Sequence, residues 1–146
     1  MADISFANTD YDLGRRKALS AYQLGMGDID RRLGNVAARA TRSFNDLSRA
    51  YKQAAPQQIT QFTGRGLGRS GLFRQSMADF AKQQERDRSR IQSQQMDEEA
   101  ALGLEQQKYE MALNEELARL ENERQKQIAA DAAALKEFAP LTGLFI

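Results

Sequence analysis

The sequence contains no cysteine, no histidine and no tryptophan, and only two prolines among 146 residues. Without cysteine there can be no disulfide framework and no thiolate nucleophile. Without cysteine and histidine together, the usual zinc ligands and the imidazole acid or base of many enzymes are also missing. The sequence therefore predicts no catalytic residue, no metal ligand and no cofactor-binding residue.

Large apolar side chains are also scarce. Aromatic residues make up 8% of the chain, and much of the 41% hydrophobic content is alanine. A chain of this length normally buries about 70% of its unfolded surface, and we expect this one to bury less alone and more against partners. No run of about 20 apolar residues is present, so no membrane span is expected. The polar, acidic start MADISFANTDYDLG does not resemble a signal peptide.

Charge is divided unevenly along the chain. Residues 1–55 carry nine Lys/Arg and six Asp/Glu, residues 56–95 carry seven and three, and residues 96–146 carry five and eleven. The three net charges are therefore +3, +4 and −6. Opposite charges of this kind favour head-to-tail or lateral pairing between copies; solvated helix faces are the alternative.

Apolar side chains recur at helical spacing from about residue 10 to 54, which predicts a first amphipathic helix and an all-α fold. The gaps alternate between three and four residues with one slip near Ala40, a pattern of the heptad type. Gly25 and Gly27 predict a kink or the close approach of another backbone, and Pro56 is expected to end the helix. The residues expected to pack are Tyr22, Met26, Ile29, Leu33, Val36, Phe44, Leu47 and Tyr51.

A Gly/Arg-rich linker is expected at residues 55–71, where the piece QQITQF could form a short strand. Gly66, Gly68 and Gly71 have the spacing G-x-G-x-x-G, but a dinucleotide site also needs a second parallel strand, and the sequence after the linker is helical. The glycines therefore indicate a chain reversal. Three arginines of this region, Arg65, Arg69 and Arg74, could contact an anion or DNA, or the acidic face of the same or a neighbouring copy.

A long second helix is expected from about residue 71 to 138, within a segment 72–139, with Ser70 as its N-cap. Residues 82–95 contain a single apolar side chain, Ile91, and are expected to cross solvent or lie in a polar groove. From Leu102 onward the apolar spacing repeats every eleven residues, which predicts straight or slightly right-handed packing. The residues expected to pack are Leu102, Tyr109, Leu113, Leu117, Leu120, Ile128 and Leu135.

Both termini are expected to be extended. Residues 1–9 form an N-terminal arm in this interpretation, and residues 140–146, PLTGLFI, form an apolar tail. Its large side chains, Leu141, Leu144, Phe145 and Ile146, are expected to dock on a partner. Coiled-coil-like packing with partner copies is expected for the two long helices. Whether they fold back as a hairpin or stay extended is left open by the periodicity.

The stretch GRGLGRSGLFRQ at residues 64–75, followed by a long helix that ends in IAADAAALKEF at residues 128–138, resembles small structural proteins of tailed bacteriophage particles. The likeness covers roughly residues 60–139. It implies a non-enzymatic virion component, present in several copies and associated with the portal, the tail or an internal core.

Two other functions fit the residues. The chain could be a coiled-coil adaptor or oligomerisation module, or a nucleic-acid-associated protein that uses the arginines of the linker. The expected partners are other copies of the chain and other virion proteins.

Overall fold

The computed structural model describes residues 3–138, and the side chains of residues 8–136. It contains two helices, α1 (Asp3–Thr63) and α2 (Gly71–Phe138), and no strand within the described residues. The all-α prediction is confirmed. The tail residues 140–146, including Leu141, Leu144, Phe145 and Ile146, lie outside the described residues.

α1 is longer at both ends than the sequence predicted. It begins at Asp3, so residues 3–9 are helical and the expectation of an extended arm is wrong for them. It also continues through Pro56 to Thr63, so the expected end at residue 54 and the strand in QQITQF are wrong. Proline removes one backbone hydrogen bond from a helix, but residues beyond it make contacts that hold the helical form. The Gln58 side-chain amide donates to Ser76 Oγ over 3.3 Å, and the ring of Phe62 packs edge-on against Phe73 with centroids 5.6 Å apart.

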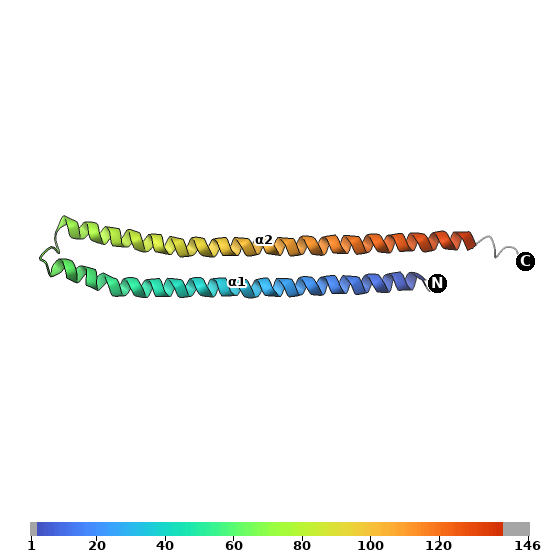
Figure 1. Cartoon of the computed structure of the whole chain (residues 1–146), viewed down its shortest axis with the longest axis horizontal. Coiled ribbons are helices and arrows are strands. Elements are labelled where there is room, and N and C mark those ends of the chain that lie inside the picture. Colours follow the sequence, from blue (N-terminus) through green and yellow to red (C-terminus); the bar gives the residue numbers. More distant parts are fainter. Residues whose placement is uncertain (1–2, 139–146) are drawn as a thin grey trace, which may run out of the picture. The chain divides into compact units, whose positions relative to one another are not determined.

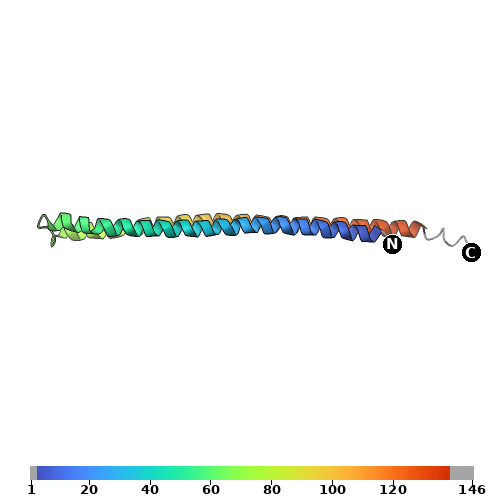
Figure 2. The same cartoon turned by 90° about the horizontal axis from the view of Figure 1, so that it is seen from below.

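The described structure divides into two compact units. Unit 1 contains residues 1–29 and 104–146, and unit 2 contains residues 30–103. In each unit a segment of α1 lies beside an antiparallel segment of α2, as the colours along the chain show (Figures 1 and 2). The fold-back arrangement that the sequence left open is therefore the one observed.

Unit 2 is a helical hairpin whose turn occupies only residues 64–70. Leu67 N–H donates to the carbonyl of Phe62, and Gly66 N–H donates to Thr63. Gly66 has a φ of +71°. These bonds form a Schellman motif, a helix ending that needs a left-handed residue and therefore favours glycine. α2 then starts at the predicted cap, because Phe73 N–H donates to Ser70 Oγ over 3.2 Å.

The inward residues follow an eleven-residue repeat along both helices, with steps of three, four and four. The heptad-type prediction for α1 is therefore replaced by the longer repeat, because Gly25 takes an inward position that the apolar pattern had given to Met26. The inward positions are half-buried or buried, apart from Tyr109, which is 38% exposed. On α1 they are Tyr11, Gly14, Ala18, Tyr22, Gly25 and Ile29 in unit 1, and Leu33, Val36, Ala40, Phe44, Leu47 and Tyr51 in unit 2.

On α2 the repeat runs through polar as well as apolar residues. The positions in unit 2 are Phe73, Ser76, Phe80, Gln84, Asp87, Ile91, Gln95, Glu98 and Leu102, and those in unit 1 are Gln106, Tyr109, Leu113, Leu117, Leu120, Arg124, Ile128 and Asp131. An eleven-residue repeat averages 3.67 residues per turn, close to an undistorted α-helix, so the same face stays inward over many turns. Among the described residues, only Ile29, Val36, Ala40 and Leu102 are buried hydrophobic residues.

Candidate functional site

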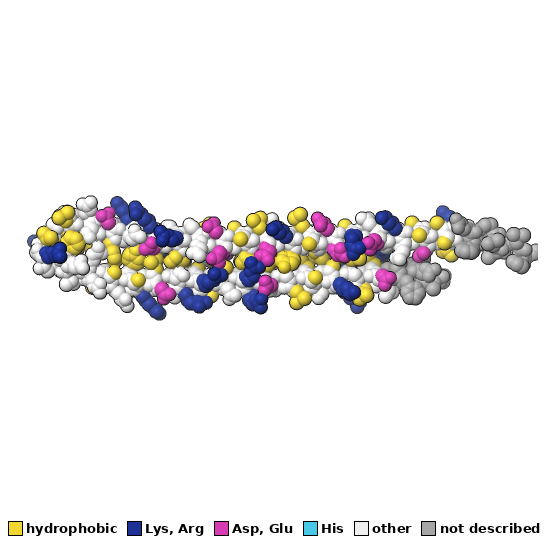
Figure 3. Space-filling view, viewed as in Figure 1, with side chains coloured by type: hydrophobic (Ala, Val, Ile, Leu, Met, Phe, Trp, Pro, Cys, Tyr) yellow, Lys and Arg dark blue, Asp and Glu magenta, His cyan; other side chains and the backbone are white. Residues whose placement is uncertain are grey.

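In each unit the surface where α1 and α2 meet, here called the seam of that unit, carries most of the residues that the sequence selected. Hydrophobic side chains follow the line between the helices and charged side chains flank it (Figure 3). Of the predicted packing residues, Ile29, Val36 and Leu102 are buried. Half-buried positions are Tyr22, Met26, Leu33, Phe44, Leu47, Tyr51, Leu113, Leu117, Leu120 and Ile128.

Leu135 differs from the rest, since its side chain is 63% exposed. It continues the eleven-residue series of Leu102, Leu113 and Arg124 on α2. In unit 1, Asn8 near the start of α1 pairs with Arg124. Leu135 lies eleven residues beyond that pairing along α2, past Asp3, the first described residue of α1.

Two glycines of unit 1 are placed opposite large side chains. A β-carbon on Gly14 would lie 2.8 Å from Cδ2 of Leu120, and one on Gly25 would lie 2.7 Å from Cε1 of Tyr109. The sequence predicted a kink or the close approach of another backbone near Gly25, whereas the structure places the side-chain ring of Tyr109 there. No atom lies within 4 Å of a β-carbon built on Gly27.

Arg124 lies on the inward face of unit 1 and is held by three groups. Its Nε donates to Asn8 Oδ1 over 3.0 Å, its Nη1 lies 3.4 Å from Glu121 Oε2, and its guanidinium lies 5.0 Å from the ring centroid of Tyr11. The eleven-residue spacing places Arg124 in register with Leu102 and Leu113. The spacing alone could therefore have identified Arg124 as a packing residue, although its charge argued against that.

The polar segment 82–95 packs on α1, so the prediction that it lies in a polar groove describes it best. The Tyr51 hydroxyl donates to Asp87 Oδ2 over 2.7 Å, and the Gln83 amide donates to the other Asp87 oxygen over 3.2 Å. The Tyr51 ring also contacts Phe80, with centroids 5.0 Å apart. The hydrogen bond to Asp87, and then partial burial, raise the pKa of the Tyr51 hydroxyl.

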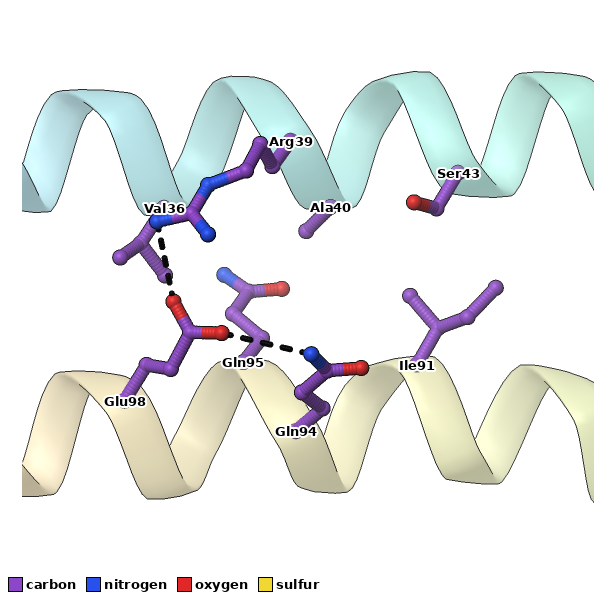
Figure 4. A pocket seen from close by; sticks show the side chains of 8 residues that line it. All are labelled: Val36, Arg39, Ala40, Ser43, Ile91, Gln94, Gln95 and Glu98. Atoms are coloured by element: carbon purple, nitrogen blue, oxygen red, sulfur yellow. Dashed lines mark hydrogen bonds and ion pairs between the residues drawn. The ribbon is translucent and has the colours of Figure 1, made fainter.

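A small hollow of about 140 Å³ is also present in unit 2 (Figure 4). Its walls include Val36, Ala40 and Ile91. Across it Arg39 pairs with Glu98 over 3.2 Å, and Gln94 donates to the same carboxylate over 3.4 Å. The hollow is smaller than the roughly 300–1,000 Å³ of ordinary ligand pockets, and its charged group is already paired.

Unit 1 contains a larger and more apolar groove, here called the tyrosine groove, of about 280 Å³. Its lining residues are Ala18, Ala21, Tyr22, Tyr109, Ala112, Leu113 and Glu116. Glu116 is the single charged member, and Arg119 Nε donates to it over 2.9 Å. This bond lowers the pKa of Glu116, which is thereby kept ionised and paired.

The arginines of the turn region, Arg65, Arg69 and Arg74, are exposed. Within the described residues their side chains have no hydrogen bond or ion pair. The glycine motif forms the turn between two helices, and α1 stands where a dinucleotide fold has a strand.

No group of three or more His, Cys, Asp or Glu residues that could hold a metal ion is found among the described residues. Over the same part of the chain, neither helix is sufficiently apolar to cross a lipid bilayer. Comparison of the chain with protein-family models, with curated proteins and with solved structures finds no match.

Proposed function

We propose that the chain is a non-enzymatic structural component of a tailed-phage particle, associated with the portal, the tail or an internal core, and that it assembles in several copies through helix packing and docking of its terminal segment. The observation that carries the assembly role is the imbalance between buried and exposed apolar residues. Four hydrophobic residues are buried, whereas ten large ones in the described residues are at least 37% exposed, Leu24 at 74% and Leu72 at 65% among them. Partner surfaces would remove these side chains from water.

Charge supports association between copies. Unit 2 carries thirteen Lys/Arg and eight Asp/Glu, a net charge of +5, and unit 1 carries eight and twelve, a net charge of −4. A basic unit of one copy and an acidic unit of another therefore attract each other, and this attraction weakens as salt is added.

The phage assignment itself is supported by the resemblance of residues 64–75 and 128–138 to phage structural proteins. It is tested by quantitative mass spectrometry of particles purified from the phage that encodes the chain. We expect several copies in each particle, at a fixed ratio to the portal protein. The proposal is wrong if purification of the particles removes the chain to the same extent as it removes the enzymes of the infected cell.

A nucleic-acid role is the second candidate because three exposed arginines, two in the turn and one in the first turn of α2, have no side-chain partner among the described residues. It predicts DNA binding that weakens steeply with salt, and that falls by a similar factor on every DNA sequence when Arg65, Arg69 and Arg74 are changed to glutamine. An adaptor role would instead give a stable dimer or trimer of the isolated chain, with no association with particles.

A further inference from the structure

The tyrosine groove of unit 1 is an apolar site with no occupant among the described residues. Ala18 and Ala21 of α1 and Ala112 of α2 form part of its lining between larger side chains, and small residues at these positions leave its volume of about 280 Å³ open. That volume is sufficient for one or two large apolar side chains.

The groove is also held in shape by contacts outside it. The ring of Tyr109 lies against Gly25, so it has little freedom to fall into the space over the alanines. The carboxylate of Glu116 is bonded to Arg119 and is not available to bind a cation in the groove. An uncharged apolar segment therefore matches the groove better than a charged ligand does.

The chain itself contains such a segment. Residues 140–146 have no charged side chain and include Leu141, Leu144, Phe145 and Ile146. Two of these, Leu144 and Phe145, are adjacent, so an extended segment presents large apolar groups on both of its sides.

The distance along α2 decides which copy of the groove the segment can enter. Glu116, the lining residue nearest to the end of α2, precedes Phe138 by 22 helical residues, or about 33 Å at about 1.5 Å per residue. Ile146 is eight residues past Phe138, which spans at most about 29 Å even when fully extended. Leu113, a further lining residue, precedes Phe138 by 25 residues, or about 38 Å, so the four side chains cannot fill the groove of their own chain.

We propose that residues 141–146 of one copy occupy the tyrosine groove of a second copy. This inference does not depend on the phage assignment, because it concerns only the contact between two copies of the chain. Each copy has one groove and one apolar segment, so two copies can either exchange segments and close as a dimer or continue as an open series.

The test uses full-length chains with one half of the contact removed at a time. The first variant carries Leu144→Asp and Phe145→Asp, which makes the segment polar and leaves the groove intact. The second carries Ala21→Glu, which places a charge in the groove and leaves the segment intact. Ala37→Glu is the matched control, since Ala37 is also an exposed alanine of α1 but lies in unit 2, away from this groove.

Sedimentation velocity reports the association of each chain and of an equimolar mixture. We expect the unmodified chain and Ala37→Glu to associate alike, and each of the two other variants to associate at least about tenfold more weakly. The mixture of the two variants should form a one-to-one heterodimer, because it contains one intact segment and one intact groove. Helix content measured by circular dichroism should be the same in Ala21→Glu and Ala37→Glu, since glutamate is a good helix former.

Several results would overturn the proposal. A monomeric unmodified chain, full association of Ala21→Glu, or a mixture that stays monomeric would each show that the groove and the segment do not bind each other. If Ala21→Glu loses helix content, Ala112→Lys places a charge in the same groove from α2. A folded Ala112→Lys chain that associates as strongly as the unmodified chain would also overturn the proposal. Particles could still contain the chain in each of these cases, so the phage assignment is judged separately.

Discussion

Gly25 of α1 lies under the ring of Tyr109 of α2, so closely that a β-carbon at Gly25 would stand 2.7 Å from Cε1 of the tyrosine. Real β-carbons do not approach other atoms to this distance. The pair therefore explains a glycine within a helix, where glycine costs about 1 kcal/mol relative to alanine: the missing side chain makes room for the ring.

The first prediction compares two glycines of the same helix. Gly25→Ala forces the Tyr109 ring to move and should lower the free energy of unfolding by about 1–3 kcal/mol. Gly27→Ala, whose β-carbon meets nothing within 4 Å, should raise it by about 0.5–1 kcal/mol. Urea denaturation followed by circular dichroism measures both. The destabilisation by Gly25→Ala should shrink in a chain that also carries Tyr109→Ala, and equal stabilisation by both alanines would contradict the contact.

The second prediction concerns burial in α1. Ile29 is 1% exposed and Leu24 is 74% exposed, although both are large aliphatic residues of unit 1. Ile29→Ala should cost about 2–5 kcal/mol of unfolding free energy, and Leu24→Ala should change it by no more than about 0.5 kcal/mol at concentrations where the chain is monomeric. Denaturation curves of the two variants decide this, and similar losses would mean that the inward face of α1 is misassigned.

The third prediction is a loss of stability at alkaline pH. The pKa of Tyr51 is raised in the folded chain, first by its hydrogen bond to Asp87. The stabilisation of the fold by the protonated Tyr51 hydroxyl is therefore complete below the ordinary tyrosine pKa of about 10. It is lost as the pH rises through the higher pKa of Tyr51 in the folded chain. Tyr51→Phe should lower the melting temperature by a few degrees at neutral pH and flatten its fall above about pH 10. The same alkaline slope in Tyr51→Phe as in the unmodified chain would argue against the hydrogen bond.

The fourth prediction applies at acid pH. Arg119 donates to Glu116 and lowers its pKa, and Glu121 also has a lowered pKa, chiefly because Gln125 donates to it. Because the pKa values of these two glutamates are lower in the folded chain, their ionised carboxylates stabilise the fold above the ordinary glutamate pKa of about 4.5. This stabilisation is lost as the pH falls through the pKa values of the folded chain. Arg119→Met should therefore reduce the acid dependence of helix content between pH 2.5 and 6 by a small amount, since exposed ion pairs contribute little. Lys136→Met removes one positive charge elsewhere on α2 and serves as the control; an equal effect of both changes would indicate a general charge effect.

The sequence predicted the helical class, the cap at Ser70 and the extent of α2, because each depends on local signals. The end of α1 was missed because Pro56 is a strong local signal for a helix end, and contacts distant in sequence, Gln58 with Ser76 and Phe62 with Phe73, outweigh it. The expected linker of 17 residues is in fact a turn of seven.

The repeat of α1 was missed for a different reason. A search for apolar residues passes over Gly14 and Gly25, yet both take inward positions. The inward polar residues of α2, such as Asp87 and Arg124, could not be recognised by hydrophobicity either. The eleven-residue spacing of residues 102–139 includes Arg124, and it reaches Asp87 when it is continued back through the polar segment. Periodicity, and not residue type, therefore defines the inward face.

The imbalance between buried and exposed apolar residues predicts that further copies of the chain complete its apolar packing. Sedimentation equilibrium of the full-length chain over a wide concentration range tests it most directly. We expect an average mass that rises with concentration above that of one chain. A single-chain mass at every concentration, together with cooperative unfolding of that monomer, would contradict it.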